Sequence, residues 1–480
     1  MTRPLFLFAL TALTTVAPIL AHSQSIENNL DTYMTARELL GQFSGAVLVA
    51  RNGKVLLAKG YAYSDIAKKS PNTAETRFRA ASITKQFTAM AILQLREAGK
   101  LSLDDSICRW VERCPDAWKA VTIAHLIHHS SGIPDYEEAL ELGSDRYAQF
   151  TKDAHNAELI LDSARLKPLD FPPGSKFHYS NTGYILLAHI IEKASAMPFA
   201  EYMQKKIFEP AGMKSTGIFS SGDDVPRQAI GYEGAAVPRP LDSVVAGIPL
   251  TNSGARPVPR IDMSGIHGDG GMFTTVTDLN TWVNALFGER IIPKRLLDEY
   301  MTPGLGNRDS AATEGYAFGW IIGTSEGMRT QYHTGLVPGF VSRLERYPDS
   351  GVVVIVMSNA EFFRISRISR DLAAATMGRP YDVPRPHHIV PLDSAAARSY
   401  VGKYLLETGD TATVSIGDKY VEVAIPNRFT AGLLPESASR FYVPFFEGTV
   451  EFRHDSTGKI ESLVMHYNGR DRVARRIASQ

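Results

Sequence analysis

The sequence is short of the features that mark several classes of protein. Cysteine occurs only twice in 480 residues, as Cys108 and Cys114, which is too few ligands for a cysteine-based metal site. Neither charge sign is in excess, because 51 lysines and arginines balance 51 aspartates and glutamates. Without a basic surplus a nucleic-acid partner is not expected. There is no internal repeat, and the composition excludes collagenous and wholly disordered classes.

Long apolar runs are also absent beyond the N-terminus. The single extended run, Leu5–Leu20, follows Arg3 and is short for a bilayer span. Ala21-His22-Ser23 follows it, with small residues at the cleavage-type positions Ala21 and Ser23. This pattern predicts a secretory signal peptide over residues 1–23, with a membrane anchor as the alternative. We therefore expect an exported, periplasmic or secreted protein with no integral membrane segment after cleavage. In an oxidising compartment the two cysteines favour a disulfide over two free thiols.

The length favours two domains, because a single core seldom grows to 480 residues. Residues 377–392, MGRPYDVPRPHHIVPL, carry four prolines and are typical of an extended linker. We place a first domain at 24–378, the linker at 379–392 and a second domain at 393–480.

The first domain combines strands at both ends with helices between them. Asn52-Gly53 between two apolar runs predicts a hairpin, and the all-round apolar pattern of Ser82–Gly99 predicts a buried helix. Further helices are expected over 181–194, 199–208 and 278–287, and strands over 318–322 and 352–357. The terminal strands would then close one sheet.

The second domain is predicted to be a small, barrel-like all-β module. Alternating runs separated by turn residues predict strands over 413–416, 420–425, 441–443, 449–453 and 463–467.

The first candidate catalytic motif is Ser82-Ile83-Thr84-Lys85, at the start of the predicted buried helix. The i, i+3 spacing puts the hydroxyl and the amine on one face, where a deprotonated lysine can take the proton of the serine nucleophile. The tetrapeptide alone is weak evidence, since Ser456–Lys459 has the same pattern in a predicted turn. Two later motifs add to it: Tyr179-Ser180-Asn181 and His333-Thr334-Gly335. Taken singly, the former fits a helix cap and the latter a structural histidine.

Together, in this order, the three motifs resemble the penicillin-recognising signature of Ser-x-x-Lys, a polar second motif and Lys-Thr-Gly. The chain resembles the serine β-lactamase-related hydrolases, which include class C β-lactamases, D-alanyl-D-alanine carboxypeptidases, D-aminopeptidases and some esterases. The resemblance covers roughly residues 30–375 and extends to the segments 44–53, 125–135, 268–274 and 347–359. It implies an α/β (α+β) β-lactamase/transpeptidase-like fold, in which an antiparallel sheet is flanked by helices beside an all-helical region. The second domain resembles the small antiparallel β module often appended to these hydrolases.

The resemblance also implies the roles of single residues. Ser82 would be acylated, Lys85 would be its proton partner, and Tyr179 would activate the deacylating water. Asn181 would orient the scissile amide, and the backbone N–H groups of Ser82 and Leu336 would form the oxyanion hole. The substrate carboxylate would be held by the His333-Thr334-Gly335 segment, through the side chains of His333 and Thr334.

The histidine of this last motif departs from class C β-lactamases, which carry lysine there. His-Thr-Gly is found in certain secreted D-alanyl-D-alanine carboxypeptidases. The expected function is therefore a serine hydrolase that forms an acyl-enzyme on D-amino-acid peptides, as a carboxypeptidase or an aminopeptidase. Its partner would be a small or peptidoglycan-like peptide substrate, a β-lactam or an ester. A β-lactamase or esterase is one alternative, and a non-catalytic cell-wall binding or scaffold protein is another.

Two further patterns carry less weight. Gly323–Gly327 matches the Gly-x-Ser-x-Gly elbow, but no helix is predicted after it, which favours a hairpin turn. His125, His128 and His129 crowd together without a carboxylate ligand or an HExxH arrangement. We expect neither a metal nor a cofactor.

Overall fold

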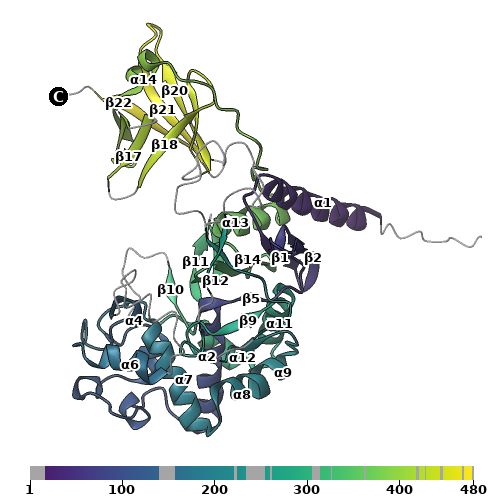
Figure 1. Cartoon of the computed structure of the whole chain (residues 1–480), viewed down its shortest axis with the longest axis vertical. Coiled ribbons are helices and arrows are strands. Elements are labelled where there is room, and N and C mark those ends of the chain that lie inside the picture. The colour runs from purple at the N-terminus through teal and green to yellow at the C-terminus, as the bar shows by residue number, and fades with distance from the viewer. Residues whose placement is uncertain are drawn as a thin grey trace, which may run out of the picture.

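The computed structural model describes residues 17–139, 157–220, 224–233, 255–259, 262–304, 314–325, 327–361, 364–417, 421–426, 429–443, 447–467 and 470–477. A sheet with helices on both faces forms the larger part, and a barrel lies at one end of the molecule (Figure 1). A helical region lies at the opposite end. The expected fold class is confirmed for both parts.

One seven-stranded sheet organises the larger part, in the order β10-β11-β12-β13-β14-β1-β2. Its first strand along the chain, β1, pairs antiparallel with its last, β14, from Gly45 opposite Ser358 to Arg51 opposite Val352. The prediction that distant segments close one sheet is therefore confirmed. The strands are β1 (Gly45–Arg51), β2 (Lys54–Tyr61), β10 (Gly315–Tyr316), β11 (Ile321–Ser325), β12 (Met328–Val337), β13 (Phe340–Tyr347) and β14 (Val352–Ser358).

The two faces of this sheet pack against different helices. Alternate residues of a strand point to opposite faces, and Val47 and Val49 of β1 pack with α1 (Ala17–Leu39) and α13 (Ile365–Thr376). Ala46 and Leu48 belong to the larger core, which contains α2 (Thr84–Glu97) and α11 (Val276–Phe287). A strand that is buried on both faces has a nearly continuous apolar sequence. The sequence of β14, VVVIVMS, fits this rule, and every one of its residues is buried.

The predicted hairpin and helices are confirmed with small shifts of boundary. Asn52 and Gly53, between β1 and β2, both have positive φ, as a tight hairpin turn requires. The strand expected from residue 318 begins at Ile321. The other helices are α3 (Ile123–Ile127), α4 (Tyr136–Ala139), α6 (Ala157–Arg165), α7 (Asn181–Ser195), α8 (Phe199–Met203), a π-helical turn (Gln204–Phe208), α9 (Glu209–Ala211) and α12 (Lys294–Tyr300).

Short strands and turns complete the larger part. They are β3 (Tyr63–Asp65), β4 (Ser70–Pro71), β5 (Phe78–Arg79), β6 (Gly217–Ile218), β7 (Tyr232–Glu233), β8 (Arg256–Pro257), β9 (Met272–Thr274) and the 3-10 turns Ala81–Ile83, Ile107–Arg109 and Asp116–Trp118. Cys108 and Cys114 are joined by a disulfide in this region, with their Cα atoms 5.3 Å apart.

The C-terminal part is a closed barrel of eight strands in sequential order. The strands are β15 (Gly402–Leu406), β16 (Thr411–Ile416), β17 (Val421–Ile425), β18 (Phe429–Pro435), β19 (Arg440–Val443), β20 (Gly448–His454), β21 (Ile460–Tyr467) and β22 (Arg470–Ile477), preceded by α14 (Ser394–Tyr400). The five predicted strands correspond to β16, β17, β19, β20 and β21. The sequence analysis did not predict β15, β18 and β22.

Residues 379–393 join the two parts without helix or strand, and the domain limits at 378 and 393 remain a proposal. Ion pairs connect the parts: Arg37 of α1 lies 2.7 Å from Glu447 beside the barrel strand β20. A cleft of about 620 Å³, open to solvent, lies at this interface. Its lining includes Arg37, Arg367, His387 and His466 and none of the predicted catalytic residues.

The predicted signal peptide falls mainly on residues 1–16, which lie outside the described residues. The expected cleavage segment Ala21–Ser23 is within α1, and cleavage there remains a prediction. Among the helices described, none is long and apolar enough to cross a membrane.

Candidate active site

Ser82 lies in the 3-10 turn Ala81–Ile83 that leads into the buried helix α2. Ala81 has φ +49°, a left-handed conformation that is strained for a residue with a Cβ. The turn is held by hydrogen bonds at both ends, from the Ala80 N–H to the Met272 carbonyl (2.8 Å) and from the Thr84 hydroxyl to the Ala81 carbonyl (2.6 Å). Strain kept by surrounding structure is a common feature of functional sites.

Lys85 is fully buried and makes three hydrogen bonds with its amine. Nζ lies 3.1 Å from Ser82 Oγ, 2.8 Å from Asn181 Oδ1 and 2.9 Å from the Asp269 carbonyl oxygen. An ammonium group has three donors and no acceptor, whereas the neutral amine has two donors and one lone pair. Asn181 and Asp269 can occupy the two donors of the neutral amine. Its lone pair is then directed at the Ser82 hydroxyl.

Tyr179 and Asn181 stand beside this pair at the start of α7. The Tyr179 ring centroid is 5.0 Å from Lys85 Nζ, and Ser180 caps α7 with its side chain. Buried His129 packs against the Tyr179 ring with the ring centroids 4.2 Å apart, and its Nδ1 accepts a 3.0 Å hydrogen bond from the Ser180 N–H. The segment is thus fixed in position from both sides of Ser180.

The strand β12 closes the site from the other side. A Cβ on Gly335 would lie 2.2 Å from the Ala80 carbonyl oxygen and 2.5 Å from Ser342 Oγ, so only glycine allows this approach to the nucleophile turn. The pairing of β12 with β11 ends at Tyr332, whereas its pairing with β13 continues to Val337. One edge of the segment that contains Leu336 therefore has no strand partner among the described residues.

His333 occupies the inner side of this strand and is 2% exposed. Its Nδ1 lies 2.6 Å from the Thr334 carbonyl oxygen, and because a carbonyl oxygen can only accept, Nδ1 carries the proton and donates it. In a neutral ring Nε2 is then the acceptor, and the Tyr316 hydroxyl donates to it at 3.0 Å. Burial lowers the pKa of His333 to about 3, and the positive charge of Lys85 adds to this effect when its amine is protonated. The imidazole is therefore neutral at physiological pH. Both ring nitrogens are engaged within the protein, and neither is open to the substrate carboxylate expected there. Of the two side chains predicted to bind that carboxylate, half-buried Thr334 is the one still available.

Three carboxyl groups lie within electrostatic range of Lys85. Burial raises the pKa of Asp269 to about 8, with Glu137 and Asp135 raising it further and Lys85 opposing them. Burial and the neighbouring Asp135 also raise the pKa of Glu137. Asp135 is buried, and its carboxylate accepts the backbone N–H groups of Asn181 and Glu137. Asp269 is therefore largely protonated at neutral pH, and the groups left to supply negative charge on this side of the site are Asp135 and Glu137.

The sequence analysis missed His129 as a support of Tyr179, and it missed Asp135, Asp269 and Tyr316. His129 and Asp135 do lie in the 125–135 segment singled out by resemblance, but their contacts with Ser180 and Asn181 are long-range. The histidine-rich segment itself forms no metal-type group in the part of the chain described. His125 Nδ1 instead accepts the Thr122 N–H in a helix cap.

The two discounted serine motifs lie in hairpins, as predicted. Ser325 is the last residue of β11 and pairs with Met328 of β12; Glu326 lies outside the described residues. Ser456–Lys459 forms the turn between β20 and β21, closed by the Asp455 N–H donating to the Lys459 carbonyl.

Comparison with known proteins gives consistent matches. The sequence pattern of the beta-lactamase family matches residues 27–379. A penicillin-binding protein of Bacillus subtilis is 32% identical over 470 residues, which cover 93% of this chain and 99% of that protein. A D-aminopeptidase of Gluconobacter oxydans is 27% identical over 71% of this chain and 60% of its own length. The D-amino acid amidase of Ochrobactrum anthropi, solved with D-phenylalanine, has a TM-score of 0.60 at 25% identity and covers 74% of this chain and 99% of its own.

Proposed function

This chain belongs to the beta-lactamase family of serine hydrolases, and from that premise we propose that it cleaves amides of D-amino acids through an acyl-enzyme on Ser82. The observation that carries the proposal is the contact of Lys85 Nζ with Ser82 Oγ at 3.1 Å, in a buried site where Asn181 and Asp269 fix the amine.

The proposed reaction has two steps. Ser82 Oγ attacks the amide carbon while its proton passes to Lys85, and the backbone N–H groups of Ser82 and Leu336 stabilise the oxyanion. The C–N bond breaks, and the amine leaves with a proton. Water, activated by Tyr179, then hydrolyses the ester and frees Ser82. Asn181 positions both Lys85 and the substrate amide.

Within this class we propose an aminopeptidase or amidase type over a carboxypeptidase type. A carboxypeptidase must bind a free carboxylate, which a charged residue favours, and the His333 ring is neutral and engaged. An aminopeptidase must bind an α-ammonium, which the carboxylates of Asp135 and Glu137 favour, whereas Asp269 is largely protonated at neutral pH. Glu137 is the least buried of the three and is the one we assign to the ammonium.

A pair of substrates tests this assignment. We expect kcat/KM for D-alanine p-nitroanilide to exceed that for its N-acetyl derivative by at least about 10-fold, equivalent to about 1.4 kcal/mol. Glu137→Gln should bring the ratio close to one by weakening binding of the free amine. Glu112→Gln, a surface carboxylate paired with Lys193, is the matched control and should keep the wild-type ratio. A preference for a peptide with a free C-terminal D-alanine carboxylate and a blocked amine would show a carboxypeptidase instead.

A further inference from the structure

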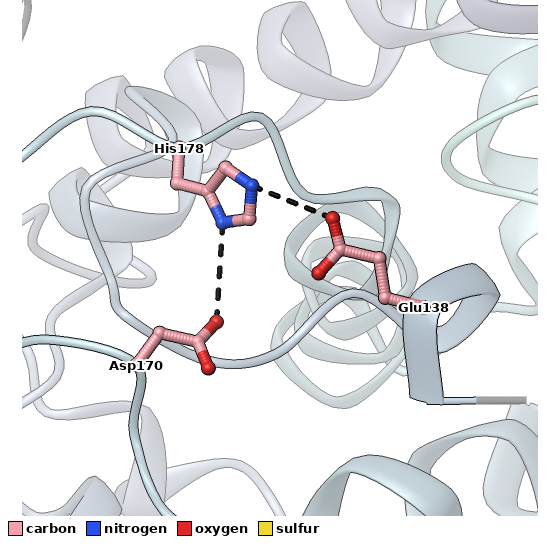
Figure 2. Close-up of side chains that lie close together, drawn as sticks. All are labelled: Glu138, Asp170 and His178. Carbon is pink, nitrogen blue, oxygen red and sulfur yellow. Dashed lines mark ion pairs between the residues drawn. The ribbon is translucent and has the colours of Figure 1, made fainter. Parts of the chain in front are cut away.

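A histidine and two carboxylates gather next to the proposed second base. Glu138 lies in α4, Asp170 lies in the connection between α6 and α7, and His178 directly precedes Tyr179. Figure 2 shows the imidazole between the two carboxylates, with Nε2 3.5 Å from Glu138 Oε1 and Nδ1 3.9 Å from Asp170 Oδ2. One ligand atom from each residue lies within 4.8 Å of the other two. In the part of the chain described, this is the one group of three metal-type side chains that meets that condition.

The backbones of Asp170 and His178 are hydrogen-bonded to one buried segment, residues 129–135, and Glu138 follows that segment in the chain. The Asp170 N–H donates to the Gly132 carbonyl, and the His178 N–H donates to the His129 carbonyl, both at 2.8 Å. Glu138 follows Asp135, whose carboxylate accepts the Glu137 N–H. The three Cα positions are therefore preorganised, and only exposed side-chain ends need to move for a common centre to form.

Among the described residues, no lysine or arginine forms an ion pair with Glu138 or Asp170, and His178 is the partner of both. The three side chains are between 41% and 63% exposed. Two carboxylates and one imidazole thus lie together at the surface, which favours a cation.

We propose that Glu138, Asp170 and His178 bind a divalent transition-metal cation, for which zinc is the probe. One imidazole nitrogen with two carboxylate oxygens is a ligand set that zinc accepts, with the remaining positions open to water. Zinc–ligand distances of about 2.1 Å in tetrahedral geometry place ligand atoms about 3.4 Å apart. The 3.5 Å separation of His178 Nε2 and Glu138 Oε1 already fits that value. Asp170 lies 3.9 Å from the other ring nitrogen, Nδ1, so the exposed imidazole and the Asp170 side chain must both rotate to place all three ligand atoms around one ion.

A bound ion would connect α4 to the segment that carries Tyr179. His178 is one residue before Tyr179, and α4 begins directly after Asp135, which holds the Asn181 N–H. Zinc would therefore stabilise the local structure around these residues without touching the reacting atoms. The site is independent of the proposed reaction, and its test needs no turnover.

The test is calorimetric titration of zinc into the tag-free full chain after removal of metal with a chelator. We expect one zinc ion per chain, a rise in Tm with zinc, and much weaker binding of magnesium, which disfavours nitrogen ligands. His178→Ala and Asp170→Asn should each weaken zinc binding at least 10-fold without lowering the Tm of the metal-free protein. His466→Ala is the matched control, because His466 also lies between two carboxylates, Glu451 and Asp471. The ligand atoms of those three residues are not all within 4.8 Å of one another. No zinc binding by wild type, or equal binding by wild type and His178→Ala, would overturn the proposal.

Discussion

Replacing Lys85 by methionine is expected to lower kcat/KM for D-amino-acid amides by about 10³-fold, the middle of the range for a lost general base. Methionine keeps the length and packing of the side chain in this fully buried position but has no group to accept the Ser82 proton. It also leaves Asn181 Oδ1 and the Asp269 carbonyl without their donor. The measurement is steady-state kinetics with Tm recorded for each protein, so that loss of fold and loss of chemistry are separated.

The chain supplies its own control for that variant. Lys459 has the same Ser-x-x-Lys spacing from Ser456 but lies in an exposed barrel turn. Lys459→Met should therefore retain full activity. A folded Lys85→Met protein with more than about one tenth of wild-type kcat/KM would show that Lys85 is not the proton acceptor.

Gly335→Ala is expected to lower kcat/KM by at least about 10²-fold, because its Cβ would collide with the Ala80 carbonyl oxygen and displace the nucleophile turn by the order of 1 Å. The same overpacking should cost about 1–3 kcal/mol of the free energy of unfolding. Kinetics and denaturant unfolding on the same preparation measure the two effects.

Gly327→Ala separates backbone strain from collision. Gly327 begins the same strand region with φ +76°, and a Cβ there meets nothing within 4 Å. Alanine should cost about 1–2 kcal/mol of conformational strain and leave kcat/KM unchanged. Equal losses of activity in both glycine variants would mean that Gly335 acts only through stability.

The sequence predicted those elements whose signals are local. The all-round apolar pattern of α2, the Asn52-Gly53 turn and the alternating strands of the barrel each depend on neighbours in the chain. Strand β22, RDRVARRI, was missed because its arginines outnumber its apolar residues. It forms because β21 and β15 lie on either side of it and complete the barrel.

Functional contacts between residues far apart in the chain could not be predicted from the sequence. The proximity of Asp269 to Lys85 joins residues 184 positions apart, and no local pattern signals it. His333 was expected to face the substrate carboxylate, but the Tyr316 hydroxyl on β10 takes its Nε2. The Glu138, Asp170 and His178 group comes from three separate segments and likewise has no motif.

The most direct test of acylation at Ser82 is the intact mass of the protein after incubation with a fluorescent penicillin, for wild type and Ser82→Ala. We predict one penicilloyl adduct per chain on wild type and none on Ser82→Ala, with a lifetime that reports how fast the acyl-enzyme is hydrolysed. An adduct of equal yield on Ser82→Ala would contradict the account. A wild-type protein that forms no adduct and hydrolyses no β-lactam, small ester or D-amino-acid amide would also contradict the account. That result would favour a non-catalytic cell-wall binding protein.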